Sequence, residues 1–329
     1  MAALALPPAP ATAGRSCPLH YRYAPSGFAR PAGLACEVLY VVGGLYGNEP
    51  ALDAVLTLFE RESGPKHLLF NGDFHWFDSD PAVFRRVSER VLAFGALRGN
   101  VETELAQEPA DTDATGCGCG YPDWVGDGVV ERSNRILQRL RQTARSCPDL
   151  RAPLAALPMW ARVDVGALRV GIVHGDAESL AGWGFAQEHL RDAAHRARAR
   201  SWFEAAQVDA FACSHTCLPV FHTFGRAGQH DGPVVLNNGA AGMPNFRGDP
   251  AGLLTRIALR PFAGPERRHG IRRGELHLDA VAIEYDVARW RAQFLAQWPA
   301  GSDAHASYWD RISAGPHCRP SAALSRSED

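Results

Sequence analysis

Several short apolar runs in this sequence end at glycine, Asp, Asn or His, and this pattern limits what the chain can fold into. The run ends read Gly72-Asp73, Gly99-Asn100, His174-Gly175-Asp176 and Ser214-His215-Thr216. Short apolar runs that are closed by glycine are typical of buried strands, and the segments between them predict a parallel sheet wrapped by helices. Ligands of such sheets bind beyond the carboxyl ends of the strands. The polar side chains at these run ends are therefore expected to lie together.

The expected elements alternate most clearly in the first half of the chain. Strands are predicted over residues 37–42, 67–71 and 96–98, with one helix that begins after the capping residue Asn48 and another over 81–91. Farther on, helices are expected over 129–144, 183–206 and 287–298, and strands over 161–165, 168–173, 208–213, 220–223, 234–238, 255–259 and 276–285. The last two strands are expected to close a second sheet.

Length and composition fit either one large α/β domain or two small ones. The chain has 329 residues, of which 46% are hydrophobic and 21% charged, and these values are ordinary for a globular protein. We expect a disordered N-terminal tail over 1–16, a single domain over 17–312 and a C-terminal tail over 313–329. The formal net charge of −2 gives no electrostatic reason to expect a nucleic-acid partner. No run of about 18 apolar residues predicts a membrane span, and the oligomeric state is not indicated.

The N-terminal segment and the cysteines favour a cytoplasmic location. The first residues have no basic segment, and prolines interrupt their apolar stretch, so a secretory signal is not predicted. The eight cysteines form no evident disulfide framework in a chain of this length. We therefore expect free thiols in a reducing compartment.

The run ends supply a candidate metal site made of Asp73, Asn100, His174 and His215. A single Asp or Asn after a strand is more often a turn or cap residue, so each position alone is weak. Together they offer one carboxylate, one amide oxygen and two imidazoles, which suit a divalent transition metal such as Mn, Fe or Zn. One such metal is expected, and a second is uncertain.

The order of these motifs resembles the calcineurin-like metallophosphoesterases, especially their compact bacterial members. The matching stretches are Gly44-Leu45-Tyr46-Gly47-Asn48, Gly72-Asp73, Gly99-Asn100-Val101-Glu102, His174-Gly175, Ser214-His215-Thr216-Cys217 and Asn237-Asn238-Gly239-Ala240. The resemblance implies a four-layer α/β/β/α sandwich of two mixed sheets. It also implies a hydrolase acting on ester bonds, which cleaves a phosphomonoester or phosphodiester with metal-activated water. The substrate would be a phosphorylated small molecule or another phosphoester.

The resemblance assigns a role to each matched position. The second metal of the family would be held by Asp73, Asn100, His174 and His215, of which Asp73, Asn100 and His215 would also act in catalysis. The first metal would need ligands at positions that here hold Gly44, Tyr46, Asp73 and Cys217. Val101 stands where the family has a histidine. We therefore expect a divergent member with a degraded first-metal site that works mainly with one metal.

A catalytically weak or inactive pseudo-phosphoesterase, kept as a binding or scaffold module, is the alternative. The departures at Gly44, Tyr46 and Val101 favour this alternative, whereas the complete set of four ligands for the other metal favours an enzyme.

Further candidates for a second metal or for the pocket are Tyr46, His75, Cys117, Cys119 and Cys217. Cys117 and Cys119 lie in a glycine-rich loop. This loop is either a plain surface loop or, together with Cys217, a second metal site whose soft thiolate ligands favour Zn or Fe. His75 follows Asp73 closely and either lines the substrate pocket or belongs to a loop packed by its aromatic neighbours.

Overall fold

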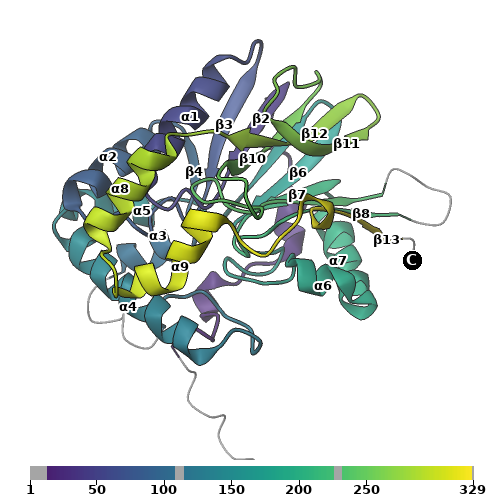
Figure 1. The fold of residues 1–329 in the computed structure, drawn as a ribbon. Helices are drawn as coiled ribbons and strands as arrows, with labels where there is room; N and C mark the ends of the chain where they lie inside the picture. Colours follow the sequence, from purple (N-terminus) through teal and green to yellow (C-terminus); the bar gives the residue numbers. More distant parts are fainter. Residues whose placement is uncertain (1–12, 108–114, 226–231, 328–329) are drawn as a thin grey trace, which may run out of the picture.

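The computed structural model describes residues 13–107, 115–225 and 232–327, and two β-sheets pack face to face within them (Figure 1). Successive side chains of a strand face opposite sides, which explains the layers. In β2 (Val38–Val42), Leu39 and Val41 pack against the other sheet, whereas Val38 and Tyr40 pack against helices. The architecture is the expected four-layer α/β/β/α sandwich of two mixed sheets.

The first sheet has the strand order β11-β12-β10-β2-β3-β4. β3 (Lys66–Asn71) runs parallel to β2, and β4 (Gly95–Leu97) runs parallel to β3. The antiparallel part consists of β10 (Gly252–Ala258), β12 (Leu276–Ile283) and β11 (Arg267–Arg273). The expectation that the strands over 255–259 and 276–285 close a second sheet is wrong, because β10 pairs directly with β2. The sequence pattern marks a strand but not its partner.

The second sheet has the strand order β1-β5-β6-β7-β9-β8-β13. Its strands are β1 (Leu34–Cys36), β5 (Trp160–Val165), β6 (Leu168–Val173), β7 (Ala210–Cys213), β8 (Pro219–Phe224), β9 (Val234–Asn238) and β13 (Leu324–Ser327). β6 and β7 are parallel neighbours, so their carboxyl ends lie at the same edge of the sheet.

Helices cover the outer face of each sheet (Figure 1). The larger group is α1 (Glu49–Glu60), α2 (Pro81–Leu92), α3 (Asn100–Ala106), α4 (Asp127–Arg145), α5 (Pro148–Ala155), α8 (Val287–Gln297) and α9 (Asp303–Ala314), and it packs on the first sheet. α6 (Gln187–Arg191) and α7 (Ala193–Ala206) pack on the second. Short 3-10 helices span Leu19–Tyr21, Pro25–Ala29 and Pro320–Ala322. None of the helices in the described ranges is long and apolar enough to cross a membrane.

Helix boundaries follow the local capping chemistry. Asn48 accepts a hydrogen bond from the backbone N–H of Ala51 at 2.9 Å and begins α1, as predicted. The single helix expected over 183–206 is wrong, because the structure divides it into α6 and α7 at Asp192. The Asp192 carboxylate accepts from the N–H of His195 at 2.7 Å and starts a new helix. An aspartate inside a helical pattern therefore marked a boundary.

Both predicted tails include residues that pack on the domain. The segment 313–329, predicted as a C-terminal tail, contains β13, which pairs in parallel with β8 at the edge of the second sheet. Of the tail predicted over 1–16, residues 1–12 lie outside the described residues. Gly14 donates a backbone hydrogen bond to Thr115 at 2.9 Å, and Arg15 donates to the carbonyl oxygen of Pro122 at 3.0 Å.

Candidate metal centre

Asp73 stands in a tight turn directly after β3. Gly72 and Asp73 both have left-handed backbone conformations, with φ of 75° and 51°. The turn is fixed by the buried carboxylate of Glu102, which accepts from the backbone N–H groups of Asp73 at 2.8 Å and Gly99 at 2.9 Å. Asp73 Oδ1 in turn accepts from the N–H of Val101 at 3.1 Å in the first turn of α3. A Cβ atom at Gly99 would lie 2.2 Å from Asp73 Oδ1, so glycine is required there.

His174 and His215 follow β6 and β7, and their hydrogen bonds decide which ring nitrogen carries the proton. His174 Nδ1 lies 2.9 Å from the carbonyl oxygen of Asn71, and His215 Nε2 lies 2.9 Å from that of Cys119. A carbonyl oxygen only accepts, so both of these nitrogens are N–H donors. The remaining nitrogens, His174 Nε2 and His215 Nδ1, face each other at 3.1 Å, each with a lone pair.

The arrangement fits a bound cation. Asp73 Oδ2 lies 3.2 Å from His174 Nε2, and the three ligand atoms of Asp73, His174 and His215 lie within 4.8 Å of one another. All three residues are buried. Within residues 13–107, 115–225 and 232–327 no other group of three His, Cys, Asp or Glu residues is placed to hold a metal.

Asn100 offers a fourth donor at the start of α3. Its Nδ2 donates to the carbonyl oxygen of Cys117 at 2.9 Å, which fixes the direction of the amide. Its Oδ1 is buried and has no hydrogen-bond partner among the described residues. A buried polar atom without a partner costs free energy, so an oxygen left in this state is suited to a metal or substrate. Asn100 lines the same cavity as Asp73 and His215.

The pKa values of the site diverge because the groups interact in a buried environment. Burial alone would raise the pKa of Asp73, yet His174 and His215 lower it. Burial opposes protonation of His174, but Asp73 outweighs burial and raises the pKa of His174. Burial together with His174 lowers the pKa of His215 to about 4. In the metal-free site, protonation therefore favours His174 over His215.

The neighbouring half of the cavity, where the family resemblance implied the first metal, is built differently. Tyr46 Oη lies 2.8 Å from Cys217 Sγ, and both residues have left-handed backbones with φ of 57° and 60°. Burial, together with Cys217, raises the pKa of Tyr46 well above its ordinary value, and burial also raises that of Cys217. A Cβ atom at Gly44 would lie 2.8 Å from Tyr46 Oη. The tyrosine ring therefore occupies space that a side chain at position 44 would need.

Cys117 and Cys119 are joined by a disulfide, so the expectation of free thiols is wrong for these two residues, whereas the other six cysteines are free. A Cys-x-Cys spacing is compatible with two free thiols or with a disulfide, so the sequence alone does not predict which of these forms. The loop that they close delivers two backbone carbonyl oxygens to the site, one to Asn100 and one to His215. The thiolate metal site built with Cys217 stays a prediction, and it would require this disulfide to be reduced. The cytoplasmic location also stays a prediction.

His75 follows Asp73 by two residues in the sequence, but its side chain does not line the cavity. Its side chain is fully buried, contacts Asp78 through Nδ1 and Ser88 through Nε2, and stacks on Phe84 at a ring distance of 4.0 Å. None of these residues lines the cavity above Asp73. The contacts favour the packed-loop alternative for His75.

Several residues around the site were not found from the sequence. Tyr308 and Arg311 of α9 line the cavity, and Arg311 donates to the carbonyl oxygens of Cys217 at 2.7 Å and Pro244 at 3.1 Å. The sequence of α9 contains no pattern that predicts contact with the segment 214–217, which lies about a hundred residues earlier in the chain. Glu102 accepts from the backbone N–H of Gly99 at 2.9 Å, as the Glu of a capping box does, but glycine has no side chain to complete that motif, so the sequence signal is incomplete.

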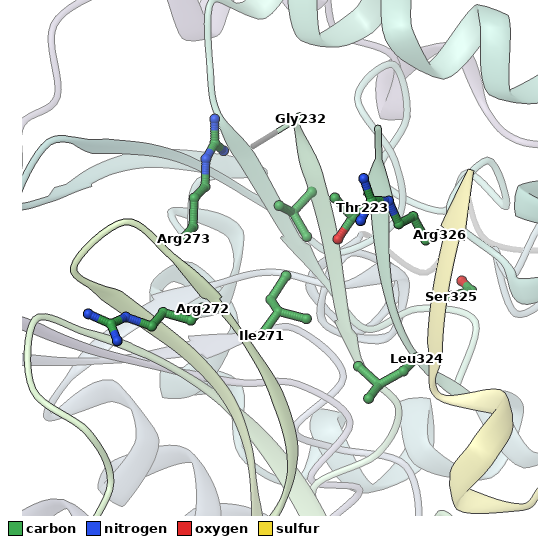
Figure 2. A pocket seen from close by; sticks show the side chains of 9 residues that line it. Thr223, Gly232, Ile271, Arg272, Arg273, Leu324, Ser325 and Arg326 are labelled. Carbon is green, nitrogen blue, oxygen red and sulfur yellow. The ribbon is translucent and has the colours of Figure 1, made fainter. Parts of the chain in front are cut away.

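A larger hollow lies elsewhere, beside the edges of the two sheets (Figure 2). It measures about 450 Å³ and is lined by residues of β8, β11 and β13, including Arg272, Arg273 and Arg326. Figure 2 shows Arg272 extending away from Arg326. Arg272 and Arg273 donate to the carbonyl oxygens of Gly274 and Asp209. Because this hollow contains no group that could ligate a transition metal, the smaller cavity above Asp73 is the candidate functional site.

Solved structures of other proteins share this architecture. A metallophosphoesterase from Sphaerobacter thermophilus is 17% identical, with a TM-score of 0.51 and coverage of 85% of this chain and 100% of that chain. The chain has the metallophosphoesterase fold. A hypothetical protein from Pyrococcus horikoshii OT3 shares this fold at 14% identity and a TM-score of 0.53, with coverage of 87% and 100%. The sequence itself matches no protein-family model and no curated protein. On the metallophosphoesterase fold, the candidate ligands stand at the ends of neighbouring strands.

Proposed function

We propose that this chain is a phosphoesterase that works with one divalent transition metal held by Asp73, Asn100, His174 and His215. The observation that carries the proposal is the convergence of three lone pairs on Asp73 Oδ2, His174 Nε2 and His215 Nδ1. Lone pairs at this separation repel one another unless a cation or a proton lies between them. A carboxylate, two imidazoles and an amide oxygen favour Mn, Fe or Zn over Mg.

Different residues of the cavity have different roles in the proposed hydrolysis. A cation bound there supplies a Lewis acid, which strengthens water as a nucleophile and offsets phosphate charge. Asn100 and His215 line the cavity and lie beside the position of the phosphate group. Arg311, which also lines it, is held by two backbone carbonyl oxygens and supplies a fixed positive charge for a phosphate oxygen.

The lining of the same cavity predicts that phosphoester hydrolysis is slow. Val101 lines it where a proton donor for the leaving group would be useful, and the Tyr46–Cys217 side adds no second Lewis acid. A substrate whose leaving group departs without protonation should therefore react best. The phosphoester is a small molecule, and an action on nucleic acid is not part of the proposal.

Hydrolysis of 4-nitrophenyl phosphate by protein supplied with Mn tests the function. We expect slow turnover that Asp73→Asn abolishes, because the substitution removes the charged ligand. Asp149→Asn is the matched control, since that carboxylate is exposed and pairs with Arg85 on the surface. The control should keep the wild-type rate.

A pseudo-phosphoesterase that binds a partner without hydrolysis is the second candidate. The neutral Tyr46–Cys217 contact and Val101 favour it. Equal rates for wild type and Asp73→Asn with Mn, Fe and Zn, on both monoesters and diesters, would establish this alternative and reject the enzyme.

A further inference from the structure

The cavity above the metal ligands is small and largely walled by aromatic rings. It measures about 250 Å³, below the roughly 300–1,000 Å³ that is usual for small-molecule pockets. Asp73, Asn100 and His215 contribute the polar part. The walls that rise from it are Trp76, Tyr121, Val125, Val129, Trp183 and Tyr308. A space of this size holds one phosphate and one small organic group.

The polar atoms of two wall residues are already committed, so these residues present apolar surface to the cavity. Trp183 Nε1 donates to the carbonyl oxygen of Cys119 at 2.9 Å, and Tyr121 Oη lies 3.0 Å from Ser133 Oγ. The two rings lie 5.9 Å apart and are tilted by 47°. Trp183 also lies edge-on to His215, with ring centroids 5.6 Å apart. An aromatic surface therefore begins directly beside a candidate metal ligand.

The aromatic surface continues outward from the cavity. Trp124 packs edge-on against Trp183 at 6.3 Å, yet 53% of it is exposed. Trp124 therefore extends the aromatic surface of Trp183 to the outside of the cavity. Arg311 lines the same cavity and carries a fixed positive charge. The site thus combines charged groups with an aromatic surface.

We infer that the cavity selects phosphomonoesters whose organic part is a single uncharged aromatic ring. The inference rests on the proposed function, since it places the phosphate at the metal ligands and Arg311. The ring then stacks on Tyr121 and Trp183, in the offset or edge-on geometries that aromatic pairs prefer. The volume leaves room for only one organic group, which excludes diesters with two bulky groups.

Calorimetric binding of phosphonates to the Mn-loaded protein tests the selectivity without requiring turnover. Phenylphosphonate, cyclohexylphosphonate and methylphosphonate carry similar charge and differ only in the organic group. We expect phenylphosphonate to bind at least about tenfold more tightly than the other two. Tyr121→Leu should remove most of this preference, Tyr121→Phe should retain it, and Trp124→Ala should weaken phenylphosphonate about threefold without affecting methylphosphonate.

The outcomes separate the two proposals. Equal binding of the three phosphonates, with metal-dependent hydrolysis intact, overturns the aromatic selectivity alone. A preference for phenylphosphonate that survives Tyr121→Leu also overturns it. Failure of all three to bind the metal-loaded protein overturns both the selectivity and the phosphoesterase function. A melting temperature for each variant shows that the fold is retained, and Trp124→Ala changes an exposed residue.

Discussion

The two halves of the cavity treat their polar atoms in opposite ways. On the side of Asp73 and His174, one polar atom of each side chain, Asp73 Oδ1 and His174 Nδ1, is hydrogen-bonded to the backbone. The other polar atoms, Asp73 Oδ2 and His174 Nε2, lie close together and keep lone pairs that a metal could accept. On the other side, Tyr46 and Cys217 satisfy each other, and both stay protonated. A ligand set is thus recognised less by residue type than by which atoms the surrounding structure leaves without partners.

Removal of a candidate metal ligand, or of its negative charge, should have the largest effect. We expect His174→Ala or Asp73→Asn to weaken metal affinity by more than the roughly 10–100-fold typical of groups that only orient a ligand. Elemental analysis of wild type should give about one metal per chain. The control is His222→Asn, which changes a buried histidine that contacts Ser325 and Ser327 and does not belong to the ligand group. Full occupancy in a His174→Ala, His215→Ala double variant would refute the site.

Lowering the pH should release the metal from Asp73, His174 and His215 and leave the Tyr46–Cys217 contact unchanged. A proton on His174 Nε2 competes with the cation, so affinity should fall about tenfold per pH unit below the raised pKa of His174. In metal-free protein, NMR titration should place the pKa of His174 above 6.5 and that of His215 at about 4.

The same titration has a consequence for stability. Because folding raises the pKa of His174, its protonation stabilises the metal-free protein below the unfolded value of about 6.5. This contribution is lost as pH rises through the folded pKa. Two histidines that titrate together near 6.5 would contradict the arrangement.

Reduction of the Cys117–Cys119 disulfide should weaken metal binding without changing the Tyr46–Cys217 side of the cavity. The loop that it closes positions the carbonyl oxygens bound to Asn100 and His215, so a dithiol reductant should weaken metal affinity about tenfold. Cys117→Ala with Cys119→Ala should show the same affinity with or without reductant. Unchanged affinity on reduction would show that the loop holds its shape without the bond, and a second metal equivalent in reduced protein would support the thiolate site.

Changes on the Tyr46 side should have the smallest effect. Tyr46→Phe and Cys217→Ala each remove their mutual contact, yet neither residue supplies an atom to the ligand group. We expect unchanged metal content and less than about a threefold change in hydrolysis. Loss of metal in either variant would mean that the two halves form one site.

Local features of the chain could be predicted and long-range ones could not. β2, β3, α1 and the turn at Asp73 follow from short-range patterns. The strand-end pattern also predicted that Asp73, His174 and His215 lie together, as they do in the structure, whereas their role as metal ligands stays a proposal. The pairing of β10 with β2 and the contribution of Arg311 depend on contacts between distant segments, for which spacing gives no signal. The disulfide state of Cys117 and Cys119 depends on the loop geometry and not on the sequence pattern.

The position of β2 between β3 and β10 has a consequence for synthesis of the protein. β10 begins about two hundred residues after β2 ends. A ribosome that adds about 5–20 residues per second leaves one edge of this apolar strand without its partner for roughly 10 to 40 s. An open strand edge is a template for aggregation. The nascent chain therefore spends most of its elongation time with the centre of its first sheet unprotected, and holding chaperones would act in that interval.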